Sequence, residues 1–273
     1  MLGKLIKYEF KATARRMLPL IIAVLVLSLL SSFSVMRLDS TDDYGVVQIF
    51  FILIVVAFII GIIALSVMSV VVFIDRFYKN LLGAEGYLMF TLPVSVDALV
   101  WAKLIVSFIW FVLATLVIIA AMLILGLVTS SLTITGEDIR TFMVEVKLLF
   151  AKVGTGNIIG YGVEFIVLMF VSSIAACLHF YLAMAIGQAF ANRKALWSVV
   201  FYFVLSFALS MLSAALVSIG DKLGILDAFF NLAKTAAQSV HMAAVSSIVV
   251  SAVTSAILYF PTTALLKKKL NLA

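Results

Sequence analysis

Six apolar stretches dominate this chain, and each is longer than the roughly 18 residues that a helix needs to cross a bilayer. They lie near 18–36, 46–74, 98–127, 158–190, 195–219 and 240–265. In lipid a spanning backbone must satisfy its own hydrogen bonds, so only helices and closed barrels cross the membrane. The stretches lack the two-residue alternation of a barrel strand. The sequence therefore predicts an all-α, polytopic membrane protein with six transmembrane helices and both termini on one side.

Basic residues predict which side that is. Thirteen basic and four acidic residues lie near the N-terminus, in the second and fourth gaps (with Lys103 just inside the third span) and in the C-terminal tail, whereas the other three gaps together hold six basic and eight acidic residues. The basic set comprises Lys4, Lys7, Lys11, Arg15, Arg16, Arg76, Lys79, Lys103, Arg193, Lys194, Lys267, Lys268 and Lys269. Because cytoplasmic loops are rich in Lys and Arg, we expect both termini to be cytoplasmic. The outer loops then include a first one with Asp39, Asp42 and Asp43 and longer ones at 131–156 and 220–239.

Composition excludes several other classes of protein. The chain is 65% hydrophobic and 12% charged, far from the usage of soluble domains. Its net charge of +6 is explained by membrane orientation. The sequence lacks the basic residues interleaved with aromatic residues that would predict binding to nucleic acid. The one cysteine, Cys177, cannot form an internal disulfide. We expect a single transmembrane domain over 1–273, since no loop is long enough for a soluble domain.

The first 17 residues have two faces when they are drawn as a helix. The basic face carries Lys4, Lys7, Lys11 and Arg15, and the apolar face carries Leu2, Leu5, Ile6, Phe10 and Met17. This pattern is typical of a helix that lies in the membrane interface, with basic residues at anionic headgroups. The alternative is a frayed basic tail that serves only topology.

The outer connection at 131–156 has its own helical pattern. Thr135 precedes acids at Glu137 and Asp138, as in a helix start, and apolar residues then recur at helical spacing until Gly154. Small residues at four-residue intervals, such as Gly156 and Gly160, predict close helix packing without identifying the partners. We expect a short amphipathic helix that leads into the fourth span.

The sequence lacks the motifs of a catalytic site. A phosphate-binding loop, a zinc-protease motif and a serine-nucleophile motif are absent, and His179 and His241 have no acid or second histidine at ligand spacing. We therefore expect no enzyme activity, no metal and no bound cofactor. Glu164 is the one acid within a span, so it is a candidate for an intramembrane functional residue. The structural alternative pairs it with Lys147 or Lys152 near the outer surface.

The most informative segment, 75–97, connects the second and third spans. Phe77, Leu81 and Leu82 fall on one helical face beside charged residues, a pattern expected of an exposed protein-docking surface. Pro93 interrupts helix, and Ser95 stands where the next helix is expected to be capped.

Several of these motifs together resemble the permease subunits of ABC-2-type transporters of Gram-positive bacteria. They are Glu85-Gly86-Tyr87, the block Thr91-Leu92-Pro93-Val94-Ser95, Lys103 in the following span, the opening Leu5-Ile6-Lys7-Tyr8-Glu9-Phe10-Lys11, and Gly187-Gln188 before Arg193-Lys194. The specific motifs cover about 40 residues, whereas the hydropathy plan covers the whole chain.

The resemblance implies a six-span, type V exporter arrangement in the bacterial cell membrane. Such subunits pair with a second copy or a paralogue, and each is driven by a separate ATPase subunit that binds ATP and Mg. The connection between spans two and three would be the coupling helix that inserts into that ATPase. This implication assigns coupling to Arg76, Phe77, Tyr78, Lys79, Leu81, Leu82, Glu85, Gly86 and Tyr87.

The residues leave other readings open. A secondary transporter or channel that works without an ATPase is the main alternative, and it would need a polar path built mostly from Ser, Thr and Gln188. A weakly polar interior suits lipids, peptides or hydrophobic drugs equally. Direction of transport and the choice between homodimer and heterodimer are likewise left open.

Overall fold

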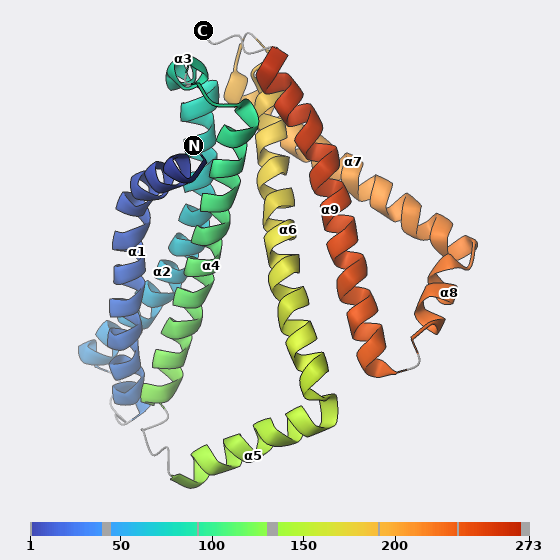
Figure 1. Cartoon of the computed structure of the whole chain (residues 1–273). Helices are drawn as coiled ribbons and strands as arrows, with labels where there is room; N and C mark the ends of the chain where they lie inside the picture. The colour runs from blue at the N-terminus through green and yellow to red at the C-terminus, as the bar shows by residue number, and fades with distance from the viewer. Residues whose placement is uncertain are drawn as a thin grey trace. The chain divides into compact units, whose positions relative to one another are not determined.

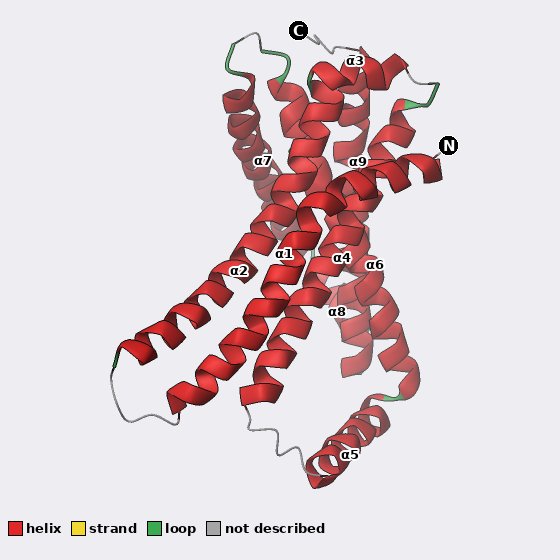
Figure 2. Cartoon of the chain, turned by 90° about the vertical axis from the view of Figure 1, so that its left-hand side faces the viewer, coloured by secondary structure: helices red, strands yellow, loops and turns green. Residues whose placement is uncertain are grey.

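The computed structural model describes residues 2–39, 45–91, 93–129, 136–190, 192–233 and 235–268, and within these ranges it contains helices and no strand (Figures 1 and 2). The elements are α1 (Leu2–Asp39), α2 (Val46–Phe77), a π-helical turn η1 (Tyr78–Leu82), α3 (Ala84–Thr91), α4 (Val96–Thr129), α5 (Gly136–Val153), α6 (Thr155–Gly187), α7 (Lys194–Lys222), α8 (Ile225–Asn231) and α9 (Ala236–Lys268). Six of them, α1, α2, α4, α6, α7 and α9, are long and apolar enough to cross a membrane. The all-α polytopic prediction is confirmed. Asp42 and Asp43 lie outside the described residues.

The chain divides into two compact units. One comprises Met1–Arg76 with Trp101–Thr141, and the other comprises Phe77–Val100 with Phe142–Ala273. The first unit therefore holds α1, α2 and most of α4. The second holds η1, α3, the first turn of α4, most of α5 and the helices from α6 to the C-terminus.

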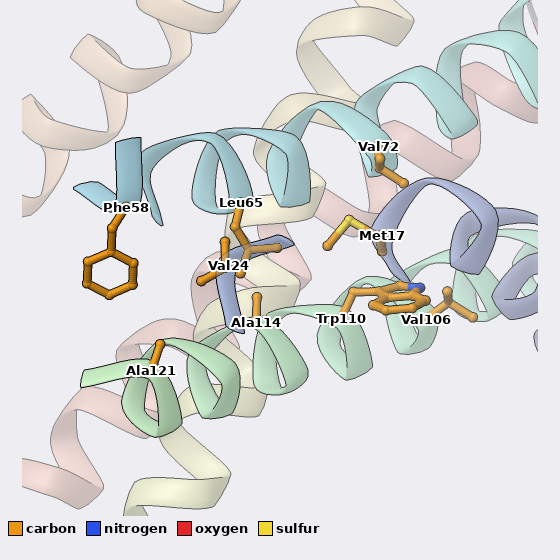
Figure 3. Packing of buried hydrophobic residues seen from close by; sticks show 9 residues of the cluster. All are labelled: Met17, Val24, Phe58, Leu65, Val72, Val106, Trp110, Ala114 and Ala121. Atoms are coloured by element: carbon orange, nitrogen blue, oxygen red, sulfur yellow. The ribbon is translucent and has the colours of Figure 1, made fainter. Parts of the chain in front are cut away.

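The core of the first unit is a seam between α1, α2 and α4 (Figure 3). Its buried side chains are Met17, Val24, Phe58, Leu65, Val72, Val106, Trp110, Ala114 and Ala121. Many other apolar side chains of these helices are exposed. In a membrane such faces meet lipid rather than water, so they do not oppose folding.

The N-terminal residues are the beginning of α1 rather than a separate helix. Figures 1 and 2 show that the first turns of α1 run at an angle to the rest, and Pro19 lies within the helix, where a proline removes a backbone hydrogen bond and causes a bend. Lys4, Lys7, Lys11 and Arg15 are exposed as predicted. The apolar face was predicted to face lipid, but Phe10 instead stacks on Trp110 of α4, with ring centroids 4.8 Å apart.

The second unit is built on α6, which packs along both α7 and α9. Ser172 of α6 and Ser251 of α9 have their hydroxyl oxygens 3.4 Å apart, and the Ser255 hydroxyl donates to the carbonyl of Val171. The contact with α7 is tightest at Gly187, where a Cβ would lie 2.7 Å from the backbone nitrogen of Ser198. Small residues therefore lie where α6 approaches α7 and α9. Of the two glycines singled out by sequence, a Cβ on Gly160 would lie 2.8 Å from His241 Cε1, whereas a Cβ on Gly156 would meet nothing within 4 Å.

The predicted helix between the third and fourth spans is α5, and it ends at Val153, just before Gly154. This glycine has φ +86°, a left-handed conformation that residues with a Cβ rarely adopt. Figure 1 shows α5 meeting α6 at a steep angle there. Thr135, the predicted cap, lies outside the described residues. The connection at 220–239 contains the short helix α8, and α9 begins at Ala236, four residues earlier than the predicted span.

Candidate functional site: the segment between α2 and α4

The segment singled out by sequence is folded along most of its length. The helix α2 continues into η1, Gly83 ends that turn, and α3 follows. Gly83 is required because a Cβ there would lie 2.9 Å from the carbonyl oxygen of Lys79. After Pro93, the Ser95 hydroxyl accepts a hydrogen bond from the backbone N–H of Ala98 at 3.2 Å. The predicted cap of the third span is confirmed.

The predicted exposed apolar strip is wrong. Phe77, Leu81 and Leu82 are all buried, as are Asn80 and Gly86. The helical face was identified correctly, but sequence alone could not show that the same chain covers it. These side chains anchor the segment within the second unit and are not available to a partner.

Two contacts fix the ends of the segment to α6 and α9. The ring of Phe77 stacks on Tyr181 of α6, with centroids 3.7 Å apart and planes within 8°. At the other end, Asp97 accepts a hydrogen bond from the Tyr259 hydroxyl at 2.7 Å and pairs with the Lys267 ammonium at 2.8 Å. The two ends of the segment are thus attached to α6 and α9.

The other side of the segment is accessible. Lys79, Glu85 and Leu88 are exposed, with Leu88 reaching 69%, and Tyr78 is half-buried. The side chain of Tyr87 lies outside what the structure describes. The candidate docking surface thus consists of Lys79, Glu85 and Leu88, of which only the two charged residues were predicted as site residues.

A buried ion cluster lies at the end of α2 just before the segment. Glu9 of α1 accepts hydrogen bonds from Arg76 Nε at 3.2 Å and Nη2 at 3.1 Å, and from Lys103 Nζ at 2.5 Å. The Glu9 and Lys103 side chains are only 9% and 3% exposed. Arg76 was predicted to contact a partner protein, but its guanidinium instead donates hydrogen bonds to Glu9. The Glu9 carboxylate therefore ties α1, α2 and α4 together.

Two further polar contacts reinforce the same end of the three-helix unit. Trp110 Nε1 donates to the Thr13 hydroxyl at 2.6 Å, and Arg16 pairs with Asp75 at 2.5 Å. Both Glu9 and Lys103 lie in motifs that carry the family resemblance, but neither was predicted to join an ion cluster. A signal was available, because Glu9 is an acid within the otherwise basic N-terminal region and Lys103 lies in an apolar span.

Glu164 has a partner that the sequence did not predict. Its Oε1 lies 2.7 Å from His241 Nδ1, so the proposed pairing with Lys147 or Lys152 is wrong. The expectation that His241 stands apart from any carboxylate is wrong for the same reason, since α6 and α9 bring together residues 77 positions apart. His179 is a packing residue as expected, hydrogen-bonded to the Ser206 hydroxyl and the Tyr202 carbonyl.

Within the described residues, no group of three or more His, Cys, Asp or Glu side chains is arranged to hold a metal. Comparison of the chain with protein-family models, with characterised proteins and with solved structures finds no match. A functional interpretation therefore rests on the sequence motifs and on the geometry of the sites described above.

Proposed function

We propose that this chain is the membrane-spanning permease subunit of an ATP-binding-cassette exporter and that a separate ATPase subunit drives it. The observation that carries the proposal is the segment Phe77–Val100, which belongs to the second unit although α2 and most of α4 on either side belong to the first. A mere tether between two spans needs neither a buried face nor fixed ends. A coupling element needs both.

The ATPase would dock on the exposed surface of Lys79, Glu85 and Leu88 and would supply the bound ATP and Mg. Closure of the ATPase on ATP moves the segment. The Phe77–Tyr181 stack passes that movement to α6, and the contacts of Asp97 pass it to α9. A second copy or a paralogue completes the translocation path, which opens alternately to the two sides.

The proposal places the chain in the bacterial cell membrane with both termini and the segment cytoplasmic. Single cysteines at Lys79 and Arg193 should react only after the membrane is permeabilised, whereas cysteines at Glu137 and Asp227 should react in intact cells. All four positions are exposed, and the background is Cys177→Ser, a position that is buried. Labelling of position 79 from outside would reverse the orientation and remove the docking surface from the ATPase.

Docking is tested by truncating Leu88. Covering a leucine that is 69% exposed contributes about 1.5 kcal/mol, so Leu88→Ala should weaken ATPase binding roughly tenfold. The matched control is Leu223→Ala, since Leu223 is 67% exposed but lies at the end of α7. Affinity is measured between the permease in nanodiscs and the candidate ATPase, identified by co-purification and mass spectrometry.

Charge provides an independent test of the same surface. Glu85→Lys should lower the association rate with the ATPase, and this loss should diminish at high salt because ions screen exposed charges. Equal affinities for the Leu88, Leu223 and Glu85 variants would contradict docking at this surface.

A secondary transporter that works without an ATPase is the second candidate, and the Glu164–His241 pair favours it. Ionisable groups within membrane spans often mark ion or proton pathways. The discriminating measurement is transport by the purified chain in liposomes. Transport driven by a pH gradient with no ATPase present would support this candidate and contradict the first.

A further inference from the structure

The most unusual polar cluster outside the segment lies between α6 and α9. His241 Nδ1 is 2.7 Å from Glu164 Oε1, and His241 Nε2 is 3.4 Å from Asn157 Oδ1. Both ring nitrogens therefore face oxygen atoms. All three residues belong to the second unit, and neighbours of Glu164 on α6, including Val163 and Phe165, are exposed apolar side chains typical of a lipid-facing helix.

The hydrogen-bond directions determine where the hydrogens lie. Asn157 Nδ2 donates to the carbonyl of Val153 at 2.7 Å, which orients the amide so that Oδ1 faces the histidine. An amide oxygen only accepts, so the 3.4 Å contact is a hydrogen bond when His241 Nε2 carries a hydrogen. On the opposite side, a bare Nδ1 and an ionised carboxylate would repel each other at 2.7 Å, so a hydrogen must also lie between them.

These two hydrogens are one more than a neutral imidazole and an ionised carboxylate supply together. A neutral imidazole carries one hydrogen and an ionised carboxylate carries none. When both hydrogen bonds are formed, the cluster therefore holds one additional proton, either on the ring or on the carboxyl group. Glu164 Oε2 is buried and has no hydrogen-bond partner among the described residues, which makes an uncompensated negative charge costly there.

We propose that Glu164 and His241 form a proton-binding site that joins α6 to α9 when it is occupied. Release of the proton leaves one hydrogen on the ring, which the Glu164 carboxylate draws to Nδ1. Nε2 then presents a lone pair to Asn157 Oδ1, and that contact is lost.

Neighbouring side chains do not hold this proton in place of Glu164 and His241. The Tyr161 ring lies against the imidazole, with centroids 4.4 Å apart, but its hydroxyl donates to the Ala237 carbonyl at 3.2 Å. Within the described residues, His241 forms an ion pair with Glu164, and no further charged side chain is hydrogen-bonded to either of them. The proton is thus shared by one carboxyl and one imidazole group.

A glycine makes room for this arrangement. A Cβ on Gly160 would lie 2.8 Å from His241 Cε1, whereas a Cβ on Gly162 would meet nothing within 4 Å. The imidazole therefore lies directly against the backbone of α6 at Gly160. The two glycines offer matched substitutions on one helix, since Ala raises helix propensity at both positions by a similar amount.

The test measures the ring hydrogens directly. The full chain contains two histidines, so 15N-histidine labelling in lipid nanodiscs gives two sets of solid-state NMR signals, and His179→Gln assigns them. At pH 7 we expect Nε2 of His241 to carry a hydrogen and Nδ1 to be protonated or to share a short hydrogen bond. A bare Nε2, with the ring hydrogen on Nδ1 alone, would overturn the proposal.

Two variants and a matched control then test the origin of the additional proton. Glu164→Gln should leave Nε2 protonated and move Nδ1 to the position of a bare nitrogen, because a neutral amide cannot hold the proton. Gly160→Ala should displace the ring and also abolish the bridging hydrogen, whereas Gly162→Ala should preserve it. If Glu164→Gln leaves both nitrogen signals unchanged, or if both alanine variants keep the bridge, the proposed site is wrong. None of these readouts depends on an ATPase.

Discussion

Burial of the Glu9 cluster allows the loss of stability on neutralising Glu9 to be predicted. Glu9→Gln keeps the shape of the side chain but removes the charge that the Lys103 ammonium, 3% exposed, and the Arg76 guanidinium both contact. Breaking a buried ion pair by neutralising one partner typically costs about 3–5 kcal/mol, because the remaining charge loses its compensation away from water. We expect the free energy of unfolding to fall by about this amount.

A mutant cycle separates the ion pair from side-chain packing. Lys103→Met should cost less than Glu9→Gln, since Arg76 still compensates the Glu9 carboxylate. The double variant should be no worse than Glu9→Gln alone, giving a coupling energy of about 2 kcal/mol, within the range for residues in one network. The control is Arg16→Gln, whose pair with Asp75 is exposed (47% for Arg16) and contributes at most about 1 kcal/mol.

Reversible unfolding in mixed micelles, followed by tryptophan fluorescence, measures all four variants. Trp110 lies in the core of the same unit and reports on it. The reasoning would be refuted if Glu9→Gln lost no more stability than Arg16→Gln. Such a result would mean that water reaches the cluster and that the three helices are held by their apolar seam alone.

Three further predictions concern single contacts, and circular dichroism follows the reversible unfolding of these variants in mixed micelles. Gly187→Ala should destabilise by about 3 kcal/mol, because its Cβ meets the backbone of Ser198, which cannot move aside; an unchanged midpoint would exclude this close approach. Ser95→Ala should cost about 1 kcal/mol through loss of the α4 cap, and Ser95→Asp should restore it. Trp110→Phe should cost about 1 kcal/mol by removing the donor to Thr13, whereas Thr13→Val in the Trp110→Phe background should cost less than in the native chain.

The spans were predictable because hydropathy over 18 or more residues is a strong local signal that tertiary contacts do not override. The helix α5 and the cap at Ser95 were predictable for a related reason, since capping residues and glycine act on the nearest turn. The boundaries of the helices were less predictable. The predicted interfacial helix and first span are one helix, α1, because Pro19 bends it without ending it.

Pairings between distant residues were not predictable. Glu164 and His241 are 77 positions apart, and Glu9 and Lys103 are 94 positions apart. Each pair requires two helices to pack in one register, which composition and periodicity do not specify. The same limit explains the error at Phe77, Leu81 and Leu82. Periodicity identifies an apolar face, but whether lipid, a partner or the same chain covers it is a tertiary property.

The Glu9 cluster also changes how the basic residues of this chain are interpreted. Arg76 and Lys103 were counted with the residues that set orientation, yet in the folded chain both contact one carboxylate from α1. Orientation is decided during insertion, before α1, α2 and α4 have packed, so both charges still serve topology at that stage. Once the helices pack, the same charges become costly unless Glu9 compensates them. A single acid in the basic N-terminal region thus reconciles the two requirements, and it fixes the end of α2 from which the segment between α2 and α4 begins.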